Sequence, residues 1–273
     1  MLREEITGEV MATGRTSEIL SFGDGKVLKL FKAGIDPTEI AQEVAHSTEA
    51  HALGATPIAC HGMGAHGDTP GIVFDALTGG SLTEMAERNL FKLRESGRIL
   101  ARCHCQLHQI ESDLFPDVRE TLTGLLERAP MAFLSPRQKT KARDVIAGLP
   151  DGSAILHMDF HTNNVFAHQD GYATIDWQTT LRGAPAADVA MTLFLLADAE
   201  LWPGVTFAQK LLYNTVRRIL RQAYLTEYKA ISGISQAELD AWRLPALIIR
   251  LAEWDIASEG ARLRAEITRL LKD

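Results

Sequence analysis

Cysteine is scarce in this sequence, and no apolar run is long enough for a membrane helix. Only three cysteines occur among the 273 residues, and Cys103 and Cys105 lie too close together in a predicted helix to bridge. Such usage is typical of reduced thiols, so we expect a cytoplasmic protein. No apolar stretch approaches the ~20 residues that span a bilayer. The opening residues, MLREEITGEV, lack the apolar segment of a secretory signal, so we expect no membrane partner and no leader.

Positive charge is also in short supply. The formal net charge is -7 at pH 7, whereas proteins that bind nucleic acids need a surplus of lysine and arginine to contact phosphates. We therefore expect no nucleic-acid partner. An acidic balance suits a cationic substrate, but it serves general solubility equally well. The sequence does have a hydrophobic content of 46% over 273 residues, enough for the core of one large or two small domains.

The first third of the chain has the pattern of a small β-rich lobe. Two β-prone runs within residues 17–31 flank Gly23-Asp24-Gly25, a combination that favours a β-hairpin. Residues 37–53 carry apolar positions at helical spacing and are followed by a glycine, a common helix terminator. Residues 71–77 form a short apolar segment that we expect to be a strand. We predict that residues 1–76 form this lobe.

The remaining residues, 77–273, are predicted to form a larger and mainly helical lobe. Apolar residues at helical spacing predict helices over 90–110, 118–128, 136–148, 186–198, 206–226, 236–255 and 258–271. Short β-prone segments at 153–157, 164–167 and 172–175 interrupt this pattern. Polar residues gather in the loops between these segments, which is where functional side chains tend to lie.

The polar residues of this region suit phosphoryl transfer. The segment His157-Met158-Asp159-Phe160-His161-Thr162-Asn163-Asn164 places Asp159 five residues before Asn164, and Asp176 follows after a predicted hairpin. Transfer from ATP needs a carboxylate that orients the acceptor hydroxyl and accepts its proton, and it needs oxygen ligands for Mg²⁺. Mg²⁺ prefers carboxylate and amide oxygens. Asp159 is therefore the candidate base, and Asn164 and Asp176 are candidate metal ligands, although Asp and Asn are also common in turns.

A cation for the phosphates is available in the first lobe. Lys29 lies in the apolar strand Val27-Leu28-Lys29-Leu30-Phe31, where a lysine must reach solvent or find an anionic partner. Glu43, on the following helix, is the candidate partner, with Glu39 and Glu49 as competitors. A lysine–glutamate pair of this kind holds the ammonium toward the α- and β-phosphates of a nucleotide.

Two clusters also offer ligands for a transition metal. His157, Asp159 and His161 form an H-x-D-x-H pattern that suits a metallohydrolase, but that function leaves the other polar residues of the region unexplained. Cys103-His104-Cys105 with His108 suggests zinc. However, C-x-C without a second, distant pair is poor zinc spacing, and the amphipathic helix that carries the cluster favours packing instead.

These motifs resemble those of the aminoglycoside phosphotransferase and choline kinase group, which is related to the protein kinases. The family's loop motif, H-G-D-x-H-x-x-N, is similar to residues 157–164, and its metal-binding I-D-[FW] is similar to Ile175-Asp176-Trp177. Its later G-x-P-x-x-D-[LV]-A is similar to residues 183–190. Further similarities are the strand lysine, its helix partner, the nucleotide-covering loop and a helix that ends in Leu-His: Lys29, Glu43, Gly14–Glu18 and Leu107-His108.

The resemblance implies a two-lobed, protein-kinase-like α+β fold and an ATP-dependent transfer of phosphate to a small-molecule hydroxyl. It implies that ATP lies in a cleft with its adenine against the connecting segment near Phe74–Leu77, and that Mg²⁺ is the cofactor. The residues implied are Ser17, Lys29, Glu43, Phe74 and Leu77 for the nucleotide, Asn164 and Asp176 for Mg²⁺, Asp159 as the base, and His157, His161 and Asp188 as supporting residues.

Two departures from the family pattern affect this expectation. Met158 stands where the family has glycine, and methionine resists backbone conformations that glycine adopts freely. The nucleotide-covering loop has little glycine, so we expect cover from the backbone around Thr16 and Ser17. A catalytically inactive, nucleotide-binding relative is the main alternative, but it would lack the base, the metal ligands or the lysine, and all of these are present.

The acceptor is not specified by any motif beyond Ala190. Acidic residues late in the chain could contact an amine-bearing acceptor such as an aminoglycoside or choline: Glu200, Glu253, Asp255 and Glu259. The same residues equally suit a solvated helix surface. The chain thus predicts a small-molecule hydroxyl acceptor without naming it.

Overall fold

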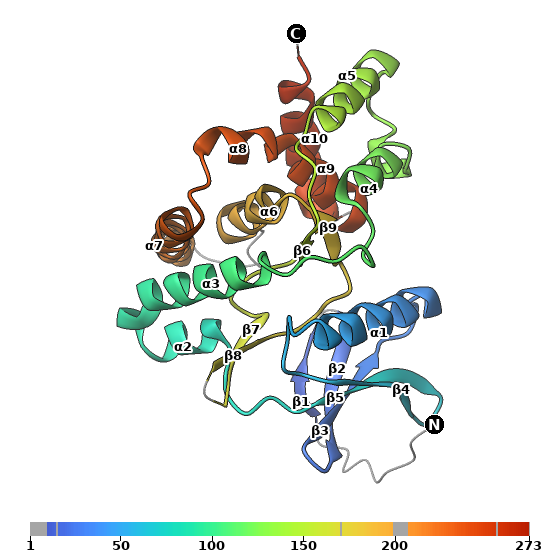
Figure 1. Ribbon diagram of the computed structural model, residues 1–273, viewed down its shortest axis with the longest axis vertical. Coiled ribbons are helices and arrows are strands. Elements are labelled where there is room, and N and C mark those ends of the chain that lie inside the picture. Colours follow the sequence, from blue (N-terminus) through green and yellow to red (C-terminus); the bar gives the residue numbers. More distant parts are fainter. Residues whose placement is uncertain (1–9, 15, 170, 199–206, 255, 273) are drawn as a thin grey trace. The chain divides into compact units, whose positions relative to one another are not determined.

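The structure is a computed structural model that describes residues 10–14, 16–169, 171–198, 207–254 and 256–272 (Figure 1). The chain divides into two compact units. One comprises the residues up to Leu82 together with Asn163–Thr179, and the other comprises Thr83–Thr162 and the residues from Thr180 onward. Among the described residues, no helix combines the length and the apolar character that crossing a bilayer requires.

The first unit is built on a five-stranded antiparallel sheet with the order β1-β2-β3-β5-β4 (Figure 1). Its strands are β1 (Val10–Thr13), β2 (Ser17–Gly23), β3 (Lys26–Phe31), β4 (Cys60–His66) and β5 (Thr69–Asp75). The predicted hairpin joins β2 to β3. Its turn is tight because Gly23, Asp24 and Gly25 all have positive φ angles. Since β3 is paired on both sides, Lys29 lies opposite Ile19 and Ile72.

The helix α1 (Pro37–Ala52) packs against this sheet. Asp36 caps its first turn, as its side chain accepts a backbone hydrogen bond there. Ile40 packs with Phe31 and Ile72 in one buried cluster. Glu43 lies one turn further along the same face and is also buried. The amphipathic spacing of α1 thus brings a carboxylate to the sheet.

The hairpin of β7 (Val165–His168) and β8 (Gly171–Thr174) belongs to the first unit, although the sheet strands end at Asp75. Several hydrogen bonds attach it there. The backbone N–H of Ala167 donates to the carbonyl of Gly80 at 3.0 Å. The hydroxyl of Thr56 donates to the carbonyl of Thr174 at 2.7 Å. This attachment brings the residues after β8 into the unit that carries Lys29.

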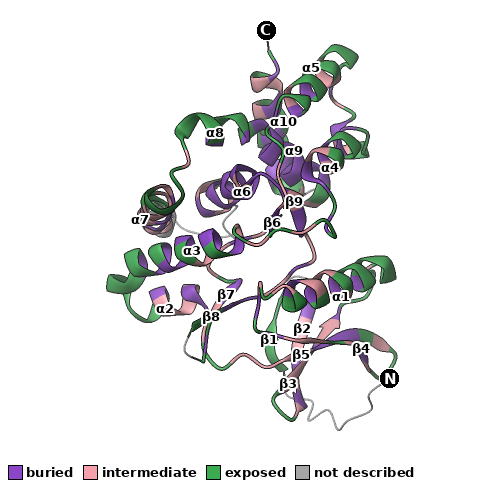
Figure 2. Cartoon of the chain, viewed as in Figure 1, coloured by how far each residue is buried: buried purple, intermediate pink, exposed green. Residues whose placement is uncertain are grey.

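The second unit is mainly helical, as predicted. Its helices are α2 (Leu82–Arg88), α3 (Leu93–Leu107), α4 (Val118–Leu125), α5 (Pro136–Ala147), α6 (Pro185–Asp198), α7 (Phe207–Ser232), α8 (Gln236–Ala241), α9 (Arg243–Trp254) and α10 (Ala257–Leu270). Short 3₁₀ turns lie at Leu90–Lys92 and Ala129–Met131, and β6 (Ala154–Leu156) pairs with β9 (Leu181–Gly183). Helices α6 and α9 are the most buried, and α5 and α8 expose one side (Figure 2).

Helices α3 and α7 approach each other closely at Gly97. A Cβ atom at this position would lie 2.7 Å from the carbonyl oxygen of Leu220 and 2.9 Å from the Cβ of Ala223. Such distances do not occur between real atoms of this kind, so glycine is required for this packing. The close approach places His104, two turns later on α3, against Tyr224 of α7.

Some elements differ from the sequence predictions. The single helix predicted over 236–255 is two helices, α8 and α9. Pro245 explains the break, because its ring clashes with the carbonyl of the residue four positions earlier, Ala241, where α8 ends. Strand β4 was not predicted because its glycines disfavour strands. Yet Gly64 is needed there, since a Cβ would lie 2.8 Å from Val73. Strands β1 and β9 and helix α2 were not predicted either.

Candidate active site

Lys29 is held on β3 by two carboxylates of its own unit. Its Nζ atom lies 2.6 Å from Oε1 of Glu43 and 3.1 Å from Oδ1 of Asp176. The Glu43 side chain is 1% exposed, so the ion pair with Lys29 is largely buried. The helix therefore supplies Glu43 as the partner, whereas Glu39 accepts a hydrogen bond from Gln178.

The two carboxylates fix the charge of Lys29. Burial alone would lower the pKa of Lys29, but Asp176 and Glu43 outweigh it, and the pKa lies above its ordinary value. Lys29 is therefore a cation at neutral pH. Burial raises the pKa of Glu43 against the opposing effect of Lys29. Since Oε2 of Glu43 has no hydrogen bond, loss of Lys29 would leave a buried carboxyl group without a partner.

Asn164 and Asp176 lie at the open end of the β7–β8 hairpin. The backbone N–H of Ile175 donates to the carbonyl of Asn164 at 3.0 Å, which closes this end. Asp176 has a φ angle of +69°, a conformation that aspartate tolerates better than most residues. Trp177 is buried, and its indole N–H donates to the carbonyl of Thr174 at 3.1 Å. An amide and a carboxylate thus come from one anchored hairpin, a donor set that suits Mg²⁺.

The loop that carries Asp159 is fixed by Asp188 of α6, which is fully buried. The Asp188 carboxylate accepts the backbone N–H of His157 at 2.5 Å and that of Met158 at 2.9 Å. Met158 has a φ angle of +64°, in the left-handed region that glycine adopts freely and other residues avoid. The methionine side chain therefore does not shift the loop into a right-handed backbone conformation. Met158 takes the conformation that a glycine would take.

Two histidines flank the candidate base within the second unit. His157 is buried, and its Nδ1 accepts the backbone N–H of Asp159 at 3.3 Å, so it supports the loop. Nε2 of His161 lies 3.5 Å from Oδ2 of Asp159, and the two side chains are 27% and 22% exposed. His161 therefore lies beside the carboxylate that we expect to act as base.

The residues predicted to contact the nucleotide lie on the sheet of the first unit. Ser17 begins β2, and its carbonyl accepts the backbone N–H of Gly14 at 2.8 Å, which closes a tight turn. Phe74 lies on β5 opposite Val27 of β3, and Leu77 follows this strand; both are half-buried. Arg15 of the predicted covering loop lies outside the described residues. The nucleotide contacts of these residues stay predictions.

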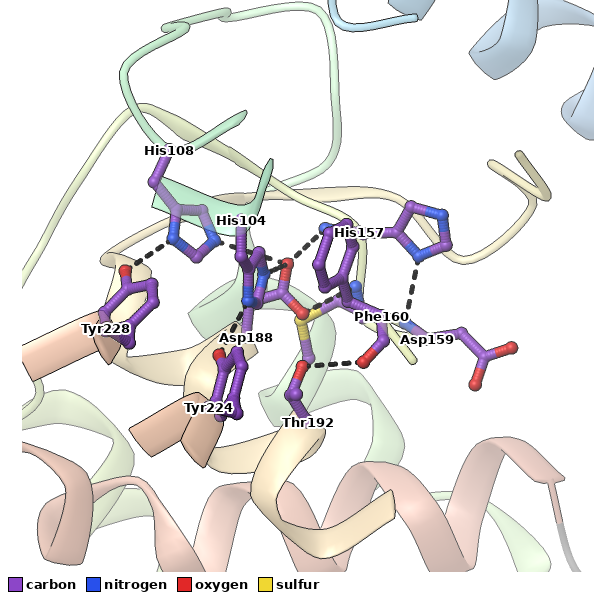
Figure 3. A network of polar contacts seen from close by, with 10 residues as sticks. His104, His108, His157, Asp159, Phe160, Asp188, Thr192, Tyr224 and Tyr228 are labelled. Carbon is purple, nitrogen blue, oxygen red and sulfur yellow. Dashed lines mark hydrogen bonds and ion pairs between the residues drawn. The ribbon is translucent and has the colours of Figure 1, made fainter. Parts of the chain in front are cut away.

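The sequence reasoning missed His104 and His108 as supports of this loop. Both belong to α3, and their Nε2 atoms lie 3.0 Å and 3.4 Å from Oδ2 of Asp188 (Figure 3). Nδ1 of His104 lies 2.8 Å from the hydroxyl of Tyr224, and Nδ1 of His108 lies 2.7 Å from that of Tyr228. The sequence does carry a signal for this arrangement. The two histidines are four residues apart, as are the two tyrosines, so each pair shares one face of its helix.

Neither of the two transition-metal clusters considered as alternatives forms in the described residues. In the part of the chain that the structure describes, the one group of three close metal-ligating side chains is His104, His108 and Asp188. The three H-x-D-x-H residues do not form such a group: His161 lies beside Asp159, but His157 turns its Nδ1 to the backbone N–H of Asp159. Cys103 and Cys105 are not part of the group around Asp188, and neither forms a disulfide. The structure thus gives the metallohydrolase interpretation no support.

The paired lysine on the sheet and the braced aspartate loop define a kinase-like scaffold, and the comparison with known families agrees. A family model described as "Phosphotransferase enzyme family" (APH) matches residues 15–231. The chain belongs to this phosphotransferase family. No curated protein sequence matches the chain.

Solved structures show the same fold. An aminoglycoside-3'-phosphotransferase of type VIII has a TM-score of 0.55 at 17% identity, over 88% of this chain and 91% of that one. The amicoumacin kinase hAmiN, solved with AMP-PNP, Ca²⁺ and Ami, has a TM-score of 0.58 at 15% identity, over 95% and 87%. A putative fructosamine-3-kinase from Haemophilus somnus 129PT has a TM-score of 0.58 at 15% identity, over 95% and 90%. The α+β kinase-like fold is thereby confirmed.

Proposed function

We propose that this protein transfers the γ-phosphate of ATP to a hydroxyl group of a small molecule. The observation that carries the proposal is the position of Lys29, held at 2.6 Å by the buried Glu43 and at 3.1 Å from Asp176. A lysine fixed in this way by a helix glutamate is suited to contact the α- and β-phosphates. Ser17, Phe74 and Leu77 would line the nucleotide site on the same unit.

Asn164 and Asp176 would hold Mg²⁺. Their side chains offer the amide and carboxylate oxygens that this ion prefers, and that of Asp176 is 40% exposed. When bound, Mg²⁺ would neutralise charge on the phosphates and favour transfer. The same carboxylate lies 3.1 Å from Nζ of Lys29, so the proposed metal ligand and the proposed phosphate-contacting cation are neighbours in this unit.

Asp159 is the proposed base. Its carboxylate would accept a hydrogen bond from the acceptor hydroxyl and so aim the oxygen at the γ-phosphorus. As the new O–P bond forms, the bond to the β–γ bridging oxygen breaks, ADP leaves and the hydroxyl proton passes to Asp159. His161, 3.5 Å from this carboxylate, would face the acceptor beside it. The catalytic gain would come mainly from positioning and charge stabilisation.

The acceptor belongs to the sugars, amino alcohols or aminoglycoside-like compounds. Two of the acidic residues considered for amine recognition are already paired: Glu253 with Arg128 at 2.6 Å, and Glu259 with the buried Arg250 at 2.8 Å. Glu200 and Asp255 lie outside the described residues. A cationic acceptor therefore gains no specific support from Glu253 or Glu259.

The free thiols of Cys60, Cys103 and Cys105 support a cytoplasmic location.

A panel of hydroxyl acceptors with ADP release as the readout tests the proposal. We expect Mg²⁺-dependent ADP release with at least one acceptor. Asp159→Asn should lower this turnover by about 10³-fold while calorimetry still detects Mg·ATP binding. Asp176→Ala should instead abolish that binding. Turnover in Asp159→Asn within a few-fold of the original would refute the base, and wild-type ATP binding without any turnover would favour the inactive alternative.

A further inference from the structure

Six buried or largely buried side chains from three helices form one polar network around Asp188 (Figure 3). They come from α3, α6 and α7: His104, His108, Asp188, Thr192, Tyr224 and Tyr228. The network reaches the Asp159 loop at several points. Besides the two backbone bonds of Asp188, the hydroxyl of Thr192 donates to the carbonyl of Phe160 at 3.0 Å. The ring of His104 stacks on that of Phe160, with centroids 4.0 Å apart.

The geometry determines where the imidazole protons lie. Nε2 of each histidine faces the Asp188 carboxylate, at 3.0 Å for His104 and 3.4 Å for His108. A nitrogen lone pair in that position would be repelled by the carboxylate, so Nε2 must carry the proton. Nδ1 is then the acceptor, and the hydroxyls of Tyr224 and Tyr228 donate to it. Burial raises the pKa of both tyrosines, which keeps these hydroxyls protonated.

The two histidines do not contribute in the same way. His108 donates a long hydrogen bond to Oδ2 of Asp188. Nε2 of His104 is close to the same oxygen but makes no hydrogen bond, so it acts through its N–H dipole. Asp188 is thereby surrounded by two backbone N–H groups and two imidazole N–H groups. A buried carboxylate needs such donors to stay charged and in one orientation.

That orientation matters because of Met158. A methionine at φ +64° relaxes toward the right-handed region unless its neighbours prevent it. The bond from its N–H to Asp188 at 2.9 Å opposes this relaxation on the backbone side. The next residue is Asp159, so a turn of the Met158 backbone would redirect the candidate base.

We propose that His104 and His108 are positioning residues: they fix Asp188 so that it holds Met158 in the left-handed conformation from which Asp159 projects. The catalytic part of this proposal rests on the proposed function. The conformational part does not, because it concerns the backbone of residues 157–159.

A metal ion is the competing occupant of this cluster, because the donor atoms of His104, His108 and Asp188 lie within 4.8 Å of one another. Two observations favour the network of hydrogen bonds. Oδ2 of Asp188 already accepts the N–H of His157 at 2.5 Å. Its other oxygen, Oδ1, accepts the N–H of Met158 at 2.9 Å, so both oxygens of the carboxylate already have backbone donors. Elemental analysis of the purified protein distinguishes the two, and one equivalent of zinc would overturn the proposal.

The test uses His108→Leu and His108→Gln in the full chain. Glutamine keeps an N–H donor near the place of Nε2, whereas leucine removes it. We expect the amides of residues 157–159 to exchange with solvent about 10-fold faster in His108→Leu, with most other amides unchanged, and near the original rate in His108→Gln. The exposed His66→Leu on β4 is the matched control and should change none of these rates.

Activity gives the second readout. His108→Leu should lower kcat by about 10-fold or more while KM for ATP stays within about two-fold, and His108→Gln should recover most of kcat. Should His108→Leu fail to fold, Tyr228→Phe serves instead, since it removes the donor that orients the His108 ring. Unchanged exchange at residues 157–159, or equal losses in the leucine and glutamine variants, would overturn the proposal. A wild-type protein without phosphotransfer would refute the proposed function, yet the exchange rates would still test the positioning.

Discussion

Asp188 accepts the backbone N–H of Met158 at 2.9 Å while Met158 holds a φ angle of +64°. The side chain of Met158 is itself buried in the core of the second unit. The loop is therefore held from two sides, by a carboxylate on its backbone and by apolar packing on its side chain. Holding a residue with a Cβ atom in the left-handed conformation costs free energy, and that cost can be measured.

The pair Met158→Ala and Met158→Gly isolates that cost, because the two variants lose nearly the same packing and differ only by a Cβ atom. We expect Met158→Gly to be more stable than Met158→Ala by about 1 kcal/mol, since glycine adopts positive φ freely. The reverse order is normal in regular structure. Urea denaturation measures both free energies of unfolding. A more stable alanine variant would show that the residue is not left-handed in solution.

Gly97 predicts a second effect on stability. Gly97→Ala would place a Cβ 2.7 Å from the backbone oxygen of Leu220, so α3 and α7 must separate. We expect a loss of about 1–3 kcal/mol and a weaker contact between His104 and Tyr224. Gly124→Ala on α4 is the control, because its Cβ would meet nothing within 4 Å. It should gain about 0.5–1 kcal/mol through helix propensity. Equal effects at both glycines in thermal unfolding would contradict the close packing.

The Lys29–Glu43 pair separates stability from nucleotide binding. Lys29→Met leaves the buried Glu43 without its partner and should destabilise the protein by about 3–5 kcal/mol. The double variant Lys29→Met/Glu43→Gln removes the unpaired charge, so it should recover much of that loss. It should not recover Mg·ATP affinity, because the phosphate-contacting cation is still missing. Calorimetry and denaturation on both variants check this, and restored ATP binding in the double variant would exclude Lys29 from the phosphate site.

Acid should destabilise the protein through His104. Burial, aided by His108, lowers the pKa of His104 to about 3 against the opposing effect of Asp188. In the unfolded chain this histidine has a pKa near 6.5, so it binds a proton at a higher pH than in the folded protein. The contribution of His104 to the free energy of unfolding is therefore fully present above pH 6.5 and is lost as the pH falls toward 3. Asp188 does not cause a loss in this window, since its own pKa is lowered and it stays ionised.

This linkage predicts about 2 kcal/mol less stability at pH 5 than at pH 7 from His104 alone. In His104→Gln the free energy of unfolding should depend less steeply on pH between pH 5 and pH 7. The difference in slope should correspond to nearly one proton fewer taken up on unfolding. The imidazole nitrogen signals of His104 in the wild-type protein should also stay those of the neutral form down to pH 5. A His104 signal that titrates near pH 6.5 would contradict its burial beside His108 and His157.

Much of the candidate site could be predicted because its side chains are specified locally. Asp159 and Asn164 share one short loop, and Lys29 is conspicuous as a charge within an apolar strand. The choice of Glu43 over Glu39 and Glu49 as the partner of Lys29 needed the structure, since the helical pattern is compatible with all three. The sequence also indicated a constraint at Met158, but only the structure shows how it is met.

The network around Asp188 could not be predicted in the same way. Its members come from α3, α6 and α7, and the contact of His104 with Tyr224 spans 120 positions. Helical spacing shows that His104 and His108 share a face, but not which partner covers it. The break at Trp242 was predictable in principle, because Pro245 marks it. The strand β4 was not, since glycine there serves packing against Val73 rather than strand propensity.

Phosphoryl transfer through Asp159 is tested most directly by following the γ-phosphate in ³¹P NMR with the best acceptor from the panel. We expect a phosphate monoester of the acceptor, formed in step with ADP by the wild-type protein and absent with Asp159→Asn. If the γ-phosphate instead appeared only as inorganic phosphate, or if Asp159→Asn formed the ester as fast as the wild type, the proposed transfer through Asp159 would be contradicted.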